Sequence, residues 1–198
     1  TLLFVAPIIY NTDYILSLWI GKAPLHSSIF VKLCLINILI DSISGPIMTG
    51  IQASGDIKRY QIVVGFLLFL NLPIGYVVLN IGGAPWYIFV VSIIISMINF
   101  QFRLIFLKRS IYFSIRKFYS DVVIRIMAVS VIVIFFPSIV EKLNIGIDSN
   151  FFHFLIDSVL LVLLTSFTIL FIGTNSAERR YVYNFILGLK IGRYSQKG

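Results

Sequence analysis

Asp41 is the residue with the clearest potential for chemistry, because it lies near the middle of an apolar stretch long enough to cross a membrane. A charged side chain at the centre of a bilayer costs about 2.5–3.5 kcal/mol by insertion scales, so it needs water or a polar partner. At about 100° per residue, a helix places Asp41 on one face with Asn37, Gly45, Met48 and Gln52. We expect this stripe to line a hydrated cavity. The alternative is a seam in which small and polar residues join two helices.

A second polar stripe lies in the third apolar stretch of the chain. Ser92, Ser96, Asn99 and Arg103 are spaced four, three and four residues apart, which places them on one face of a helix. Serine and asparagine at this spacing are also common at helix–helix contacts, so the stripe fits either a packing surface or a second wall of the same cavity. The candidates for a substrate pathway are therefore Asn37, Asp41, Gln52, Ser92, Ser96, Asn99 and Arg103.

The elements that must position these residues are five long apolar blocks, at residues 29–53, 62–81, 84–102, 122–140 and 151–173. A hydrocarbon core about 30 Å thick needs about 20 helical residues to span it, and each block has about that length. Uninterrupted apolar runs satisfy their backbone groups in a membrane as helices, not as barrel strands. We therefore predict an all-α, polytopic membrane helix bundle. It has about five complete transmembrane helices and the end of a sixth. Residues 2–20 finish this sixth helix and enter an outer loop that carries Asp13, Trp19, Gly21 and Pro24.

Prolines predict interruptions in these helices, since proline removes a backbone hydrogen bond and obstructs the preceding turn. The Gly45-Pro46 pair predicts a kink or break in the first complete helix, and Asn71-Leu72-Pro73 interrupts the second. The fourth helix is expected to end near Pro137. Lys32 lies near the start of its helix, and we expect its side chain to snorkel to the membrane surface.

The basic residues are concentrated in alternate connections between the blocks, and this pattern predicts the topology. Twelve of the sixteen follow the first, third and fifth blocks: Lys58, Arg59, Arg103, Lys108, Arg109, Arg116, Lys117, Arg179, Arg180, Lys190, Arg193 and Lys197. The connections on the opposite side hold only Lys22 and Lys142. The positive-inside rule places the basic side, including the C-terminus, in the cytoplasm. The net charge of +8 is thus explained by topology, and we expect no nucleic-acid partner.

Motifs for enzymatic chemistry are missing from the sequence. There is no Walker loop, HExxH or GxSxG pattern, and the lone Cys34 gives neither a disulfide nor a metal-ligand spacing. The connections are also too short to hold a catalytic domain. We expect a protein that is not an enzyme and that uses no cofactor, metal or catalytic residue.

Several short motifs occur in a characteristic order along nearly the whole chain. They are Ala6-Pro7-Ile8-Ile9, Leu18-Trp19-Ile20-Gly21-Lys22-Ala23-Pro24, Gly45-Pro46, Gly50-Ile51-Gln52-Ala53-Ser54-Gly55-Asp56-Ile57-Lys58-Arg59-Tyr60-Gln61 and Asn71-Leu72-Pro73-Ile74-Gly75-Tyr76. In this order they resemble the C-terminal half of the bacterial polysaccharide flippases. These flippases belong to the multidrug/oligosaccharidyl-lipid/polysaccharide exporter superfamily.

The resemblance implies a division of the chain and a fold. Proteins of this family pack two six-helix bundles around a central cavity, often with two added C-terminal helices. Residues 1–119 would then be the C-terminal part of the second bundle, truncated at its N-terminus, and residues 120–173 the added pair. Residues 174–198 would be a basic cytoplasmic tail. The chain begins with Thr1 inside an apolar stretch, so we expect a fragment that lacks the main cavity helices.

The resemblance also implies a function. Related proteins move undecaprenyl-pyrophosphate-linked oligosaccharide across the bacterial inner membrane for surface polysaccharides such as the O-antigen of lipopolysaccharide. Other polysaccharide assembly proteins are further candidate partners besides the lipid bilayer. One alternative is a multidrug or ion-coupled exporter of the same superfamily, which would rely on an intramembrane carboxylate such as Asp41. A second is a membrane-embedded glycan polymerase or acyltransferase, for which a sizeable outer loop or a His/Asp/Arg cluster is expected.

Overall fold

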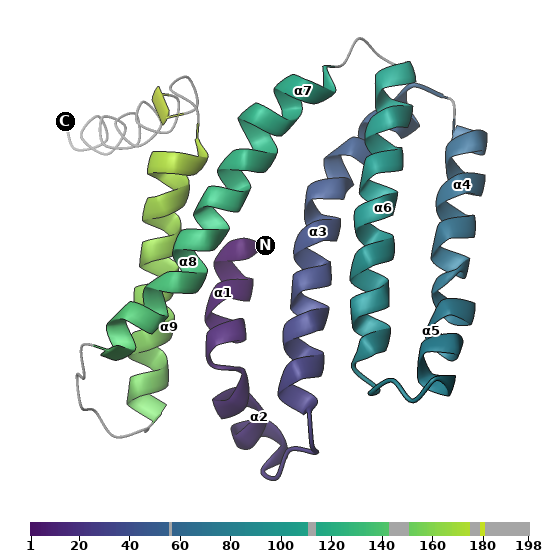
Figure 1. Ribbon diagram of the computed structural model, residues 1–198. Coiled ribbons are helices and arrows are strands. Elements are labelled where there is room, and N and C mark those ends of the chain that lie inside the picture. Colours follow the sequence, from purple (N-terminus) through teal and green to yellow (C-terminus); the bar gives the residue numbers. More distant parts are fainter. Residues whose placement is uncertain (56, 111–113, 143–150, 175–178, 181–198) are drawn as a thin grey trace, which may run out of the picture.

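The computed structural model describes residues 1–55, 57–110, 114–142, 151–174 and 179–180, except for the side chains of residues 136–142 and 153 (Figure 1). These parts are helical and contain no strand, which confirms the predicted all-α fold. The elements are α1 (Leu2–Tyr10), α2 (Thr12–Ile20), α3 (Ser27–Ala53), α4 (Ile57–Phe69), α5 (Asn71–Asn80), α6 (Tyr87–Ser110), α7 (Ile115–Phe118), the π-helix η1 (Tyr119–Val123), α8 (Ile124–Lys142), α9 (Phe151–Thr168) and the π-helix η2 (Ile169–Gly173).

Five described helical segments are long and apolar enough to cross a membrane. They are Ser27–Ala53, Ile57–Asn80, Tyr87–Ser110, Ile115–Phe135 and Phe154–Gly173. Each overlaps one predicted block, so the number and type of complete spans were predicted correctly. By the length and apolar character of these helices, the chain is a multi-pass membrane protein.

The boundaries of these helices depart from the prediction at three places. The second span is interrupted at Leu70, next to the predicted Asn71-Leu72-Pro73 site. The span that contains the second stripe continues eight residues past the predicted end, because Leu104 and Leu107 are buried against neighbouring helices. The expected end near Pro137 is wrong, since α8 continues to Lys142.

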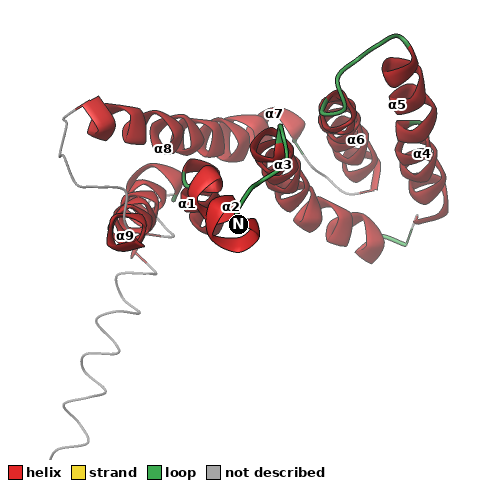
Figure 2. Ribbon diagram, turned by 90° about the horizontal axis from the view of Figure 1, so that it is seen from below, coloured by secondary structure: helices red, strands yellow, loops and turns green. Residues whose placement is uncertain are grey.

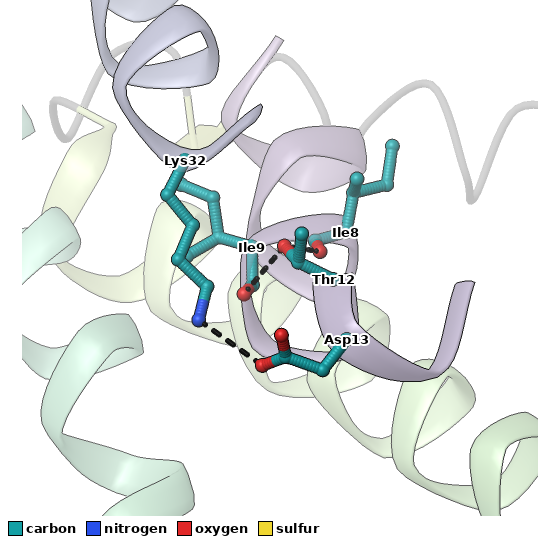
Figure 3. Close-up of polar contacts among 5 residues, drawn as sticks. All are labelled: Ile8, Ile9, Thr12, Asp13 and Lys32. Atoms are coloured by element: carbon teal, nitrogen blue, oxygen red, sulfur yellow. Dashed lines mark hydrogen bonds and ion pairs between the residues drawn. The ribbon is translucent and has the colours of Figure 1, made fainter. Parts of the chain in front are cut away.

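The segment 2–20 forms two helices, whereas we expected it to finish one helix and then enter an outer loop that carries Asp13 and Trp19. Its two halves, α1 and α2, are bent by 75° at a break around Asn11. The chain turns here because side chains bind the carbonyl groups near the break: Asn11 Nδ2 donates to the Pro7 carbonyl at 3.2 Å. The Thr12 hydroxyl lies 2.7 Å from the Ile8 carbonyl and 2.9 Å from that of Ile9 (Figure 3).

The helices form two groups that meet along α1 and α3 (Figures 1 and 2). In one group, α6 packs against α3 on one side and against α4 and α5 on the other. In the second group, α1 packs against α8 and α9, and it also contacts α3. The predicted added helices thus pack onto the first helix of the chain. The division at residues 119 and 120 stays a prediction, and the predicted tail lies almost wholly outside the described residues.

An apolar core fixes one end of the first group. Its buried members come from α3, α4 and α6, with residues of α7 and η1 packed around them: Ile47, Ile51, Tyr60, Val64, Phe100, Leu104 and Leu107. Lys58, Arg59, Lys108 and Arg109 lie at this same end of the bundle, which we call the basic end. The opposite end, which carries α2 and the α5–α6 connection, we call the α2 end (Figure 1).

Candidate functional site

The predicted stripe on α3 is divided between two surroundings. Asn37 faces α6, where its Nδ2 donates a hydrogen bond of 3.4 Å to the hydroxyl oxygen of Ser92. Met48 is packed against the apolar core. Asp41, Gly45 and Gln52 instead lie on the exposed side of the helix. Residues on the same helical face therefore meet different surroundings, because the edge of the α6 contact runs along the stripe.

The α6 stripe lies in the contact with α3, the most extensive contact between any two described elements. Asn99 and Ser96 are buried, with 3% and 6% of their surface exposed, while Ser92 and Arg103 are half-buried. Ser44, two turns beyond Asn37 on the same face of α3, is also buried. We define the α3–α6 seam by these residues: Asn37, Ser44, Ser92, Ser96, Asn99 and Arg103.

The two helices approach closely at the basic end of the seam. A Cβ atom placed on Gly50 would lie 3.0 Å from Cδ1 of Leu107, so a larger residue there would force Leu107 to move. The direct pairing of Asn37 with Ser92 lies farther toward the α2 end, and Phe30 and Phe89 make an edge-to-face contact farther still, with ring centroids 5.5 Å apart. These pairs show that α3 and α6 run in the same direction through the bundle.

The seam contains buried polar groups whose hydrogen bonds are not met by described residues. Asn99 has no partner there for Nδ2 or Oδ1, and the same holds for Nε of Arg103 and for Oδ1 of Asn37. An unpaired buried donor or acceptor costs about 1–3 kcal/mol, which weakens a packed interface. Water that entered the seam would therefore hydrogen-bond to these groups and remove this cost.

The exposed face of α3 carries a run of polar and small residues, which we call the polar face of α3: Asp41, Ser42, Gly45, Thr49 and Gln52. The hydroxyl of Ser42 donates to the Leu39 carbonyl at 2.9 Å, and that of Thr49 to the Gly45 carbonyl at 3.1 Å. Asp41 makes no ion pair with any described residue. These two hydroxyls are thus bound to their own helix, whereas the carboxylate of Asp41 is free for water or a ligand.

Pro46 adds one more polar group to this face. We expected a kink or a break at Gly45-Pro46; the helix is unbroken from Ser27 to Ala53, so a break does not occur. Proline has no N–H, however, and the Ser42 carbonyl therefore lacks the donor that a helix normally provides four residues later. Both Ser42 and Pro46 are exposed, and Ser42 directly follows Asp41 in the sequence.

The exposed surfaces of the other spanning helices have the opposite character. The α4–α5 span exposes Phe66, Phe69 and Leu72, each by more than 60%. In α8, Met127 and Ile134 are exposed to a similar degree. Large apolar side chains of this kind are suited to lipid. Among the spans that the structure describes, α3 thus differs by the charged and polar residues in the middle of its exposed face.

Three residues of these surfaces were missed by the sequence reasoning. They are Ser42, Ser44 and Thr49. Two of them follow a predicted residue at a helical spacing: Ser44 is seven residues after Asn37, and Thr49 is eight after Asp41. This spacing could have identified Ser44 and Thr49. Ser42, adjacent to Asp41, becomes visible only once the exposed side of the helix is known.

Metal ligation has little support in the described part of the chain, which holds no group of three or more His, Cys, Asp or Glu residues arranged for an ion. Cys34 is a free, exposed cysteine. Comparison of the chain with protein-family models, curated proteins and solved structures gives no match.

Proposed function

We propose that this chain is part of a bacterial flippase that moves lipid-linked oligosaccharide across the inner membrane. One observation carries the proposal: the polar face of α3, with Asp41 at its middle, is exposed on a helix long enough to span the membrane. The resemblance of the chain's ordered motifs to the polysaccharide flippases supports the choice of substrate. Transport of this kind makes and breaks no covalent bond, so the proposed protein is not an enzyme.

The polar face of α3 supports a pathway filled with water in preference to a surface in contact with lipid. A carboxylate that faces hydrocarbon at mid-membrane costs about 2.5–3.5 kcal/mol, and Asp41 has no described ion-pair partner to reduce this cost. Water along Asp41, Ser42 and Gln52 removes the cost. A lipid-linked oligosaccharide needs both surroundings at once, since its sugars stay hydrated while its polyprenyl chain stays in hydrocarbon.

The seam supports a pathway that changes width during transport. Its unpaired groups on Asn99 and Arg103 make the closed α3–α6 contact less stable than an apolar contact of the same size. A small separation of the helices would let water reach these groups. In the proposed mechanism the closed seam and the hydrated seam are two states of similar free energy, as alternating access requires.

The proposal is tested by complementation with the protein as its cell makes it. The gene is expressed in a bacterial strain that lacks its own flippase, and surface polysaccharide is measured together with lipid-linked oligosaccharide on the cytoplasmic face. We expect polysaccharide to return and the lipid-linked intermediate to fall. Abundant protein in the membrane with no change in either quantity, across strains that make different glycans, contradicts the proposal.

A second candidate function is an ion-coupled exporter, and it is favoured by the backbone next to Asp41. A carboxylate beside a carbonyl without a helical donor offers oxygen ligands of the kind that suit Na⁺ or a proton relay. Vesicles that contain the protein distinguish the two functions. Export of a lipophilic cation driven by a Na⁺ or proton gradient, without movement of lipid-linked oligosaccharide, would favour this candidate.

A further inference from the structure

Helix α2 leaves the direction of α1 by 75° and is fixed in that orientation by its own first residues. The bonds from Thr12 give the carbonyls of Ile8 and Ile9 a donor at the break, and the Pro7 carbonyl accepts from both Nδ2 and the backbone N–H of Asn11. Thr12 is buried, with 1% of its surface exposed. These side-chain hydrogen bonds hold the bend, so it is not a frayed helix end.

An ion pair holds the start of α2 against the start of α3. Nζ of Lys32 lies 3.5 Å from Oδ2 of Asp13, and the two side chains point toward one another from the two helices (Figure 3). The sequence predicts that Lys32 snorkels to the membrane surface, and the structure adds a partner nineteen positions earlier in the chain. Both side chains stay partly exposed, at 39% and 75%, which places the pair at the edge of the bundle.

Large apolar side chains gather beyond this pair, where α2 ends and the loop to α3 begins. Trp19 is 83% exposed and Leu25 is 85% exposed, and Leu18 and Ile20 are also exposed. We call these four residues the α2 tip. Lys22 and His26 are exposed in the same loop. A mixture of tryptophan, aliphatic and basic residues is typical of protein surfaces at the headgroup level of a bilayer.

The position of the tip along the chain restricts what can cover it. Residues 21–26 alone separate the end of α2 from Ser27, the first residue of a helix that crosses the membrane. The tip therefore lies at the boundary of the hydrocarbon layer, next to exposed apolar residues of the spanning helices. Helix α2 does not continue the direction of α1, because the two helices are bent by 75° (Figure 1).

We propose that α2 is an interfacial helix whose tip inserts Leu18, Trp19, Ile20 and Leu25 between the lipid headgroups and the acyl chains at the α2 end. Its partner is the bilayer itself. Asp13 and Ser17, which lie about 120–160° around the helix from Trp19, face water. This contact sets the depth of the start of α3 in the membrane, because the tip and Ser27 are joined by a short loop.

Depth-dependent fluorescence quenching in the whole chain tests the proposal. The chain has two tryptophans, so Trp86→Phe leaves Trp19 as the single reporter. The protein is placed in phosphatidylcholine vesicles that carry bromine on either the upper or the lower acyl carbons. Side chains of interfacial helices lie about 5–10 Å into the headgroup and acyl boundary, so upper bromines should quench Trp19 emission by roughly half and lower bromines by less.

A matched variant reports on the other side of α2. Trp19→Phe and Trp86→Phe remove both native tryptophans, and Ser17→Trp places one on the exposed polar side of the same helix. We expect little quenching of this reporter by either lipid. Equal quenching of the two reporters contradicts the proposed orientation. Unquenched Trp19 also contradicts the proposal: emission typical of water would show a solvated loop, and blue-shifted emission would show that polypeptide covers the tip.

Discussion

Replacement of Asn99 by leucine distinguishes between two roles of the α3–α6 seam: a contact that opens during transport, and a contact that only packs the two helices together. Asn99 is 3% exposed, and neither of its amide atoms has a partner among the described residues. Two unpaired groups at about 1–3 kcal/mol each give an upper limit of about 2–6 kcal/mol for the stability that Asn99→Leu could add. Hydrogen-bonding groups between transmembrane helices contribute about 1–2 kcal/mol in model peptides, so we expect a gain of about 1–2 kcal/mol.

The variant is measured in two assays, thermal unfolding in detergent and export in cells. For a chain of this size, about 1–2 kcal/mol corresponds to a rise in Tm of about 2–8 °C. We expect this rise together with reduced export, because leucine stabilises the closed seam and water no longer gains by entering it. Ile95→Leu is the matched control: Ile95 is buried one turn away and the substitution keeps its volume, so both quantities should change little.

Two results would refute this reasoning about the seam. A lower Tm for Asn99→Leu would mean that Asn99 is hydrogen-bonded in the closed protein, so the closed contact is not weakened by unpaired groups. Normal export at normal abundance, with a raised Tm, would mean that the seam does not open during transport. In that case the α6 stripe is a packing surface, as the alternative reading of Ser92, Ser96 and Asn99 states.

Three further predictions concern the pathway and the topology. Asp41→Asn should reduce export while abundance in the membrane stays nearly unchanged; normal export at normal abundance would show that Asp41 is dispensable to the pathway. In a variant without its own cysteine, Lys58→Cys should resist an impermeant thiol reagent in intact cells while Lys22→Cys reacts, and the reverse labelling would overturn the proposed orientation. In the double variant Asn37→Cys and Ser92→Cys, a short bifunctional reagent that joins the two cysteines should block export, and export should recover after the link is reduced. Undiminished export while the link is intact argues against separation of α3 and α6 at these two residues.

The spans could be predicted because the length of an apolar run is a local property of the sequence. A run such as residues 151–173 satisfies the membrane constraint by itself, and α9 with η2 covers the same residues. The bend at Asn11 could not be predicted in this way. Its geometry depends on hydrogen bonds from Asn11 and Thr12 to carbonyls, and Lys32 pairs with Asp13 from a different helix. The hydropathy of residues 2–20 does not indicate either interaction.

The candidate site shows the same limit at the level of side chains. Helical periodicity correctly places Asn37 and Asp41 on neighbouring positions of one face, but it cannot say which neighbouring helix covers which part of that face. The position of α6 decides this, since it covers Asn37 and leaves Asp41 exposed. The sequence also left open whether Pro46 would kink or break its helix. The helix tolerates it without a break because the affected carbonyl, that of Ser42, lies on the exposed side.

The distribution of apolar and polar residues along α6 indicates where α3 and α6 can separate. Toward the basic end, Phe100, Leu104 and Leu107 are buried in the apolar core, and Gly50 leaves room for the Leu107 side chain. Toward the α2 end, the contact includes the long hydrogen bond between Asn37 and Ser92 and the edge-to-face pair of Phe30 and Phe89. Large side chains packed together in the apolar core make many van der Waals contacts, which drive helix association inside a membrane, whereas one hydrogen bond between membrane helices contributes about 0.6 kcal/mol. The helices should therefore pivot about the core and open first at the α2 end, where α2 and its tip fix the depth of α3 in the membrane.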